Sequence, residues 1–194
     1  MGWPIRYPYP GSNGARLRFT ETELSGAFIV DIEQRVDERG FFARTYCQRE
    51  FAAHGLVPTM AQCNLALNKI LGTLRGMHWR RQHSPEAKLV RVVRGCILDT
   101  IVDLRPDSPT YLKHVQVELS ESNHRALYVP ELFAHGFQTL EDDTAVYYHM
   151  SEFYEPKYDC AARWNDPAFG IQWPISNPTM NDRDRNYPDF VPCY

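Results

Sequence analysis

Residues 113–120 read Lys-His-Val-Gln-Val-Glu-Leu-Ser, and polar and apolar side chains alternate strictly from His114 onward. In an extended chain, Val115, Val117 and Leu119 would all point to the same face, and the polar side chains to the other. This two-residue period is typical of a β-strand with one buried face. The segment therefore predicts a strand and sets the expectation for the rest of the chain.

Further strand signals follow on both sides of this segment. Residues 89–93 and 97–104 are rich in β-branched side chains, and the Arg94-Gly95 step between them is a short hairpin signal. Other short strands are predicted at residues 126–129, 136–140 and 144–149. A helix is expected around residues 48–54, closed by Gly55. Many short strands between turn signals predict an all-β sandwich or barrel.

The length of 194 residues suits one domain with a sizeable core. Residues 1–15 are rich in Pro, Tyr and Gly and are expected to form a flexible arm, with residues 16–194 as a single domain. From Trp164 onward the chain is rich in Pro, Asn and Asp, and we expect it to wrap over the barrel with a short helix or turns. Neither a secretory signal nor a membrane-spanning stretch is expected.

Charge and cysteine content narrow the class of protein. The formal net charge of −3 gives the molecule no nucleic-acid footprint, so we expect no nucleic-acid partner. Because no stretch is long enough to span a bilayer, we expect no membrane partner either. The five cysteines are far apart and never form a Cys-x-x-Cys pair. This pattern predicts free thiols in a reducing cytoplasm rather than a disulfide framework or a zinc knuckle.

A catalytic metal is not expected. Metal-binding barrels of the cupin class place two histidines one residue apart, then a Glu and a later His. Here the residue two after His78 is Arg80, a cation that does not serve as a ligand in such sites. His135 alone cannot complete a metal triad with His78. The sequence therefore predicts a site without metal or other cofactor.

Five local motifs occur in order along the chain, at residues 37–42, 74–78, 88–91, 129–137 and 163–167. Together they resemble the dTDP-4-dehydrorhamnose 3,5-epimerase family, and the resemblance runs from about Phe28 to about Phe190. It implies an all-β, cupin-type jelly-roll β-barrel with a few short helices. It also implies a homodimer, with an N-terminal strand exchanged between subunits, that acts on a nucleotide-diphosphate sugar without a metal.

The same resemblance implies a catalytic set. His78 is similar to the family's catalytic base, and Asp184 to the carboxylate that orients and charges it. Tyr148 resembles the acid on the opposite face of the sugar. Lys88 resembles the cation near the keto oxygen.

The resemblance also implies a set of substrate- and nucleotide-binding residues: Arg39, Phe41, Gln62, Asn64, Arg75, His135 and Phe153. Arg39 and Phe41 would reach the nucleotide, in the neighbouring subunit. Arg75 would lie near the diphosphate, and Phe153 would stack on the base. His135 is either a wall of the pocket or structural.

These residue types suit the chemistry of epimerisation at carbon atoms next to a ketone. Removing a proton there leaves an enolate, which an ammonium group such as that of Lys88 stabilises. A neutral imidazole is a suitable base, and a buried carboxylate fixes its tautomer. Inversion then needs a proton donor on the other face, which a tyrosine hydroxyl supplies. A 4-keto group makes both C3 and C5 acidic, so one site serves for either centre or both.

Three positions depart from the best-known family pattern: Arg44 stands where a Glu is usual, Ala66 where a Ser is usual, and Arg80 where a Gln is frequent. The nucleotide carrier therefore stays open between dTDP, CDP and GDP. Residues 80–86 are either a solvated loop or an added contact to phosphate or base. A 3,4-ketoisomerase and a non-catalytic sugar-nucleotide-binding barrel remain alternatives to the epimerase.

Overall fold

The computed structural model describes residues 16–192, so the expected N-terminal arm lies outside the described residues. Within that range the chain is mainly antiparallel strands with two short α-helices, which confirms the all-β prediction. The strands are β1 (Leu17–Glu21), β2 (Phe28–Ile32), β3 (Arg35–Asp37), β4 (Gly40–Phe42), β5 (Gln62–Asn68), β6 (Leu74–Arg80), β7 (Lys88–Arg94), β8 (Cys96–Asp103), β9 (His114–Ser120), β10 (Ala126–Val129), β11 (Phe133–Thr139), β12 (Thr144–Met150) and β13 (Asp159–Ala161). The helices are α1 (Gln48–Ala53) and α2 (Asp182–Arg185), with a 3-10 turn η1 at Pro156–Tyr158.

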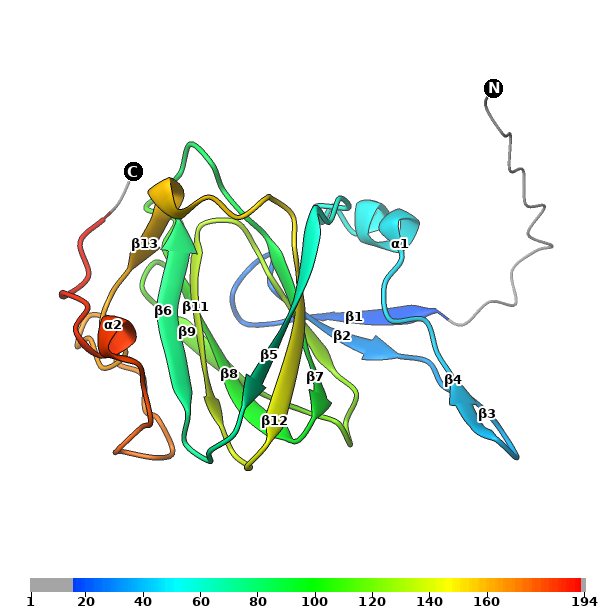
Figure 1. Cartoon of the computed structure of the whole chain (residues 1–194). Helices are drawn as coiled ribbons and strands as arrows, with labels where there is room; N and C mark the ends of the chain where they lie inside the picture. The colour runs from blue at the N-terminus through cyan, green and yellow to red at the C-terminus, as the bar shows by residue number, and fades with distance from the viewer. Residues whose placement is uncertain (1–15, 193–194) are drawn as a thin grey trace, which may run out of the picture.

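Two sheets face each other and enclose the core, as the cupin-type jelly-roll prediction requires (Figure 1). One sheet has the strand order β1-β2-β10-β7-β12-β5, and the other has the order β13-β6-β11-β8-β9. The apolar core fills only part of the space between the two sheets. The site described below lies in the remaining part.

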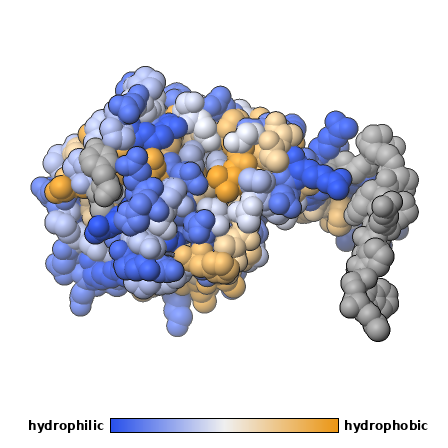
Figure 2. Space-filling model, turned by 90° about the horizontal axis from the view of Figure 1, so that it is seen from above, coloured by the Kyte–Doolittle hydropathy of each residue, from blue (hydrophilic) through white to orange (hydrophobic). Residues whose placement is uncertain are grey.

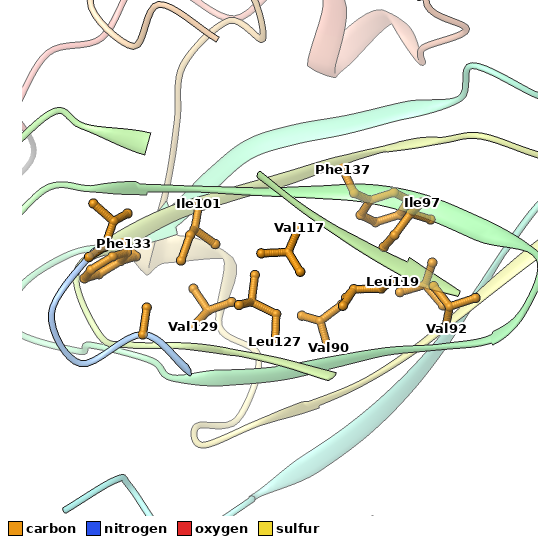
Figure 3. Packing of buried hydrophobic residues seen from close by; sticks show 13 residues of the cluster. Val90, Val92, Ile97, Ile101, Val117, Leu119, Leu127, Val129, Phe133 and Phe137 are labelled. Carbon is orange, nitrogen blue, oxygen red and sulfur yellow. The ribbon is translucent and has the colours of Figure 1, made fainter. Parts of the chain in front are cut away.

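Apolar side chains from both sheets meet in the main core (Figure 3). Val90 and Leu127 come from the first sheet, Ile97 and Ile101 from the second, and all four are fully buried. Burying one such side chain contributes about 1.5–3 kcal/mol. Val117 of β9 is buried in the same cluster, so the alternation of residues 113–120 has the predicted structural meaning.

The predicted hairpin at Arg94-Gly95 is wrong. β7 pairs with β10 and β12, whereas β8 pairs with β9 and β11, so the chain crosses from one sheet to the other at Gly95. Gly95 has φ +76°, and a Cβ there would lie 2.5 Å from Thr144 Oγ1. Gly95 allows the chain to turn from one sheet into the other, where a side chain would clash. The turn signal alone does not specify which strands pair.

The two predicted helical regions are confirmed with small changes in their ends. α1 ends at Ala53, just before Gly55, which has φ +71°. Its Phe51 is fully buried, with its ring centroid 5.9 Å from that of Tyr128. The C-terminal segment is irregular except for α2 and packs beside β6 (Figure 1).

A hairpin of β3 and β4, called here the β3–β4 arm (residues 35–42), projects away from the barrel (Figure 1). Its apolar side chains lie in solvent, with Val36 74% and Phe42 70% exposed. Exposed apolar groups concentrated on one projecting element are typical of a contact surface.

The cysteines are not all free thiols. Cys47, Cys63 and Cys96 are free, but Cys160 is disulfide-bonded, so the prediction is wrong for this residue. Cys193 lies outside the described residues. Neither helix within residues 16–192 has the length and apolarity needed to cross a membrane.

Candidate active site

A cavity of about 610 Å³ opens between the two sheets. Strands β5, β7 and β12 line one side, and β6 and β11 line the other, with residues of α2 at the edge. The predicted site residues that line the cavity are Gln62, Asn64, Arg75, His78, Lys88, His135, Tyr148 and Asp184. Segments far apart in the sequence thus bring most of the predicted set together.

A β-bulge in β6 aims Arg75 and His78 into the same cavity. His78 is paired with His135 of β11, and Arg75 with Phe137. Between these two pairs β6 therefore contains one more residue than β11. The additional residue changes the direction in which the side chains on either side of Gly76 point. Gly76 has φ +131°, and a Cβ there would lie 2.6 Å from the Cα of Gly136. Only glycine fits this close approach of two strands.

His78 and Asp184 form the central polar pair of the cavity. His78 Nε2 lies 3.2 Å from Asp184 Oδ1, and Asp184 Oδ2 accepts a long hydrogen bond from the Gly76 backbone N–H at 3.4 Å. Burial by itself raises the pKa of Asp184. The hydrogen bond and charge of His78, with smaller effects of the Gly76 N–H and the Arg183 charge, together outweigh burial and hold this pKa below its usual value. The carboxylate is therefore ionised and ready to charge-pair with an imidazolium.

Helix α2 fixes the position of that carboxylate. Asn181 caps the helix by accepting a hydrogen bond from the Asp184 backbone N–H at 2.7 Å, a capping role for which Asn is well suited. The Tyr187 ring packs edge-on against the His78 imidazole, with centroids 5.7 Å apart. The imidazole is thus oriented by a charge on one side and an aromatic ring on another.

Tyr148 enters from the opposite sheet, on β12, where it is paired with Asn64 of β5. Burial raises the pKa of Tyr148 above its usual value, although the nearby charge of Arg75 acts in the other direction. The phenol is therefore protonated at neutral pH and able to donate a proton.

Lys88 lies in a row of buried charges. Its Nζ is 3.3 Å from Glu86 Oε1, and the other oxygen of Glu86 is 3.3 Å from Arg80 Nη1. The side chains of Arg80 and Glu86 are only 5% and 2% exposed. Both ends of residues 80–86 are therefore buried, which does not fit a loop that is solvated throughout.

A second imidazole–carboxylate pair lies in the same cavity and was missed in part by the sequence analysis. His135 Nε2 is 2.6 Å from Asp99 Oδ1, and Asp99 is fully buried. The available signal was an acidic residue in the middle of the apolar run at residues 97–104, because a buried charge requires a partner.

Three predicted binding residues do not line the cavity. Arg39 and Phe41 lie in the β3–β4 arm, where Arg39 pairs with Asp37. Phe153 is 69% exposed at the rim, and the lining side chain is that of its neighbour Tyr154. Sequence analysis also missed further lining residues: Glu86, Asn181 and Arg183.

The three positions that depart from the family pattern have different surroundings. Arg44 pairs with Glu50 of α1, outside the cavity lining. Ala66 lines the cavity, and Arg80 is buried at its wall. In residues 16–192, no three His, Cys, Asp or Glu side chains are grouped as metal ligands would be.

Known proteins resemble this chain over most of its length. Residues 21–191 match the family model described as dTDP-4-dehydrorhamnose 3,5-epimerase. A relative of that name from Methanothermobacter thermautotrophicus is 42% identical over 176 residues, which cover 89% of this chain and 94% of the relative.

Solved structures agree with this match. The crystal structure of dTDP-4-dehydrorhamnose 3,5-epimerase from Bacillus anthracis, with TDP and PPi bound, has a TM-score of 0.87 at 36% identity and covers 90% of this chain and 100% of that chain. A 3'-monoepimerase from Streptomyces bikiniensis, in complex with dTDP-quinovose, has a TM-score of 0.80 at 30% identity, covering 87% and 85%. On the match of sequence, fold and family model, this chain belongs to the dTDP-4-dehydrorhamnose 3,5-epimerase family.

Proposed function

We propose that this protein inverts C3, C5 or both in a nucleotide-linked 4-keto-6-deoxyhexose, with His78 as base and Tyr148 as acid. The observation that carries the proposal is the placement of these two groups. His78 lies on β6 of one sheet and Tyr148 on β12 of the other, so the cavity has a base on one side and a proton donor on the other.

The His78–Asp184 contact supports a defined proton path. Because Asp184 accepts from Nε2, neutral His78 carries its proton there and offers the Nδ1 lone pair as base. Nδ1 takes the proton from the carbon next to the ketone, and the electron pair of the broken C–H bond moves into the enolate. Asp184 then stabilises the imidazolium, as an orienting carboxylate does in other enzymes.

Tyr148 completes the inversion from the other face. Its hydroxyl donates a proton to the enolate carbon, which restores the ketone and leaves a phenolate. Solvent returns a proton to Tyr148 and accepts one from His78, so the enzyme is regenerated. Lys88, whose ammonium faces the cavity, would stabilise the negative charge on the keto oxygen during this step.

The substrate class follows from the cations of the cavity and from the relatives. Arg75, Lys88 and Arg183 all line it, and guanidinium groups pair well with phosphate oxygens. The names of the relatives and the ligands in their structures favour dTDP as carrier. Gln62 and Asn64 add amide groups to the same wall.

A second function is supported by one observation. The His135–Asp99 pair gives the cavity a second oriented imidazole. Two imidazoles suit a 3,4-ketoisomerase, in which a proton moves between neighbouring carbons on one face. That reaction would yield a 3-keto product and would not require Tyr148.

We also propose a homodimer in which the β3–β4 arm reaches the partner subunit. The arm projects from the barrel, and apolar surface lies on the part of the barrel from which it extends (Figure 2). Packing the arm on a second copy would cover Val36 and Phe42 and bring Arg39 and Phe41 toward the partner's cavity. This placement accounts for their absence from the cavity of their own chain.

Deuterium uptake tests the proposed function directly. The protein is incubated in D2O with dTDP-, CDP- or GDP-linked 4-keto-6-deoxyglucose, with His78→Asn as the inactive control. Two deuterons with inversion mean a 3,5-epimerase, and one means a single-centre enzyme. A 3-keto product in the NMR spectrum would mean a ketoisomerase. Binding without uptake from any carrier would contradict catalysis and leave a sugar-nucleotide-binding barrel.

A further inference from the structure

The peptide bond between Phe153 and Tyr154 is held from two sides at the mouth of the cavity. Arg80 Nη1 donates to the Phe153 carbonyl at 2.8 Å, and Gln62 Oε1 accepts from the Tyr154 N–H at 2.7 Å. A carbonyl and the following N–H point in opposite directions across a planar trans peptide. The two side chains therefore grip one peptide plane from opposite sides.

This grip joins the two sheets. Gln62 belongs to β5 at the edge of one sheet, and Arg80 ends β6 in the other. Phe153 and Tyr154 are 69% and 51% exposed, and Tyr154 lines the cavity, so this exposed segment is anchored by its backbone. The grip thus determines where the rim residues stand relative to the cavity.

Arg80 also acts on the charge inside the cavity. Its guanidinium and the Lys88 ammonium share Glu86, so the three charges sum to one positive charge. Without the guanidinium, Glu86 would neutralise Lys88 and hold it away from substrate. The Arg80 Nε is buried and has no acceptor among residues 16–192, a cost that favours a role beyond stability.

We propose that Arg80 is a positioning residue for the reaction proposed above, on which this inference rests. By sharing Glu86, it weakens the hold of that carboxylate on Lys88, so that the ammonium acts on the keto oxygen. It also fixes the Phe153–Tyr154 rim against which the nucleotide end of the substrate packs. The two roles separate in kinetics, because the first affects kcat and the second affects KM.

Three variants separate these roles. Arg80→Gln removes the charge and the grip, and we expect kcat to fall about tenfold and KM to rise about tenfold. Arg80→Lys keeps the charge but not the paired hydrogen bonds, so KM rises while kcat stays near wild type. The double variant Arg80→Gln/Glu86→Gln leaves Lys88 alone with its charge and should recover kcat but not KM.

A matched control is Arg105→Gln. Arg105 also joins a buried carboxylate to a backbone carbonyl, through Asp103 and Ser25, but it does not line the cavity. This variant should lose stability while keeping kcat and KM. If Arg80→Gln keeps both constants within about twofold, or if the double variant, still folded by circular dichroism, fails to recover kcat, the proposal is wrong.

Hydrogen exchange tests the grip independently of turnover. Followed by mass spectrometry, peptides covering residues 151–155 should exchange faster in Arg80→Gln than in wild type or Arg105→Gln. Unchanged exchange there overturns the rim role. If wild-type protein turns over none of the keto sugars, the proposed function and the Lys88 role both fail, and the exchange result alone decides whether the grip exists.

Discussion

His78 on β6 and His135 on β11 are direct partners in the register of the sheet, and each imidazole contacts a carboxylate of its own. Because the cavity contains two similar imidazole–carboxylate pairs, the surroundings of each imidazole must show which one acts as the base. His78 alone is backed by α2 and the Tyr187 ring, while His135 is bound to an Asp99 that belongs to the core. This difference favours His78 as the base.

Substitution of each histidine tests that choice. His78→Asn should reduce deuterium uptake by at least about a thousandfold, because the base is lost. His135→Asn should retain uptake within about tenfold of wild type, since it alters only the wall of the cavity. NMR detection of exchange in D2O measures both. The reverse order of the two effects would assign the base to His135.

Asp184→Asn should lower kcat by about a hundredfold or more, since the amide no longer stabilises an imidazolium. The same variant tests whether the charge of the Asp184 carboxylate stabilises the folded protein. The pKa of Asp184 is lowered in the folded protein, so its stabilising effect is full above the unfolded pKa of about 3.9 and is lost as pH falls through the folded value. The difference in Tm between wild type and variant should therefore shrink on acidification below about pH 4.

Asp182→Asn is the control for this prediction, because Asp182 is exposed on the same helix. Its Tm should follow that of wild type at every pH. A difference between wild type and Asp184→Asn that stayed constant from neutral to strongly acidic pH would mean that the carboxylate charge is not the source of stability.

Tyr148→Phe should uncouple exchange from inversion. The variant keeps the base, so substrate still loses and regains a proton, but inversion should slow about a hundredfold. Because burial raises the pKa of Tyr148, the wild-type acid should stay protonated at neutral and mildly alkaline pH. Tyr147→Phe, on the neighbouring residue outside the cavity lining, should invert at the wild-type rate. Full inversion by Tyr148→Phe would argue against a two-face mechanism.

Gly76→Ala should destabilise the protein by about 3 kcal/mol or more, since it adds a clash to an unfavourable backbone conformation. Gly40→Ala is a suitable comparison. Gly40 has a similar φ of +126°, but a Cβ at this position would have nothing within 4 Å, whereas at Gly76 the nearest atom would be 2.6 Å away. Chemical denaturation should show the larger loss at Gly76, and equal losses would assign the whole cost to φ.

Phe42→Asp in the β3–β4 arm should convert a dimer to a monomer, because an exposed carboxylate opposes packing of the arm. Light scattering after gel filtration measures the mass in solution. Val191→Asp, at another exposed apolar residue, should leave the mass unchanged. A wild-type protein that runs as a monomer would contradict the dimer itself.

Local sequence patterns predicted where strands and helices lie better than they predicted which strands pair with each other. The alternation at residues 113–120 and the helix before Gly55 were confirmed because both depend on neighbours in sequence. The Arg94-Gly95 turn was misread because a glycine turn does not tell which sheet receives the next strand.

Within the site, the family motifs predicted Arg75, His78 and Lys88, and all three line one cavity, the first two because of the bulge in β6. Glu86 was missed because a single acidic residue in a polar segment carries no local pattern, and the position of Asp99 in an apolar run does not tell which residue is its partner. Their importance appears only when distant strands place a cation or an imidazole beside them.

The His78–Asp184 pair joins positions 106 residues apart. On a ribosome, every strand of both sheets emerges before α2 does. A growing chain can therefore assemble its barrel and still have an unpaired imidazole. Catalytic competence would arrive in one late event, when α2 docks beside β6. A truncation just before Asn181 would keep every strand of both sheets but lose the Asp184 carboxylate, and screening for soluble expression alone would not reveal that loss.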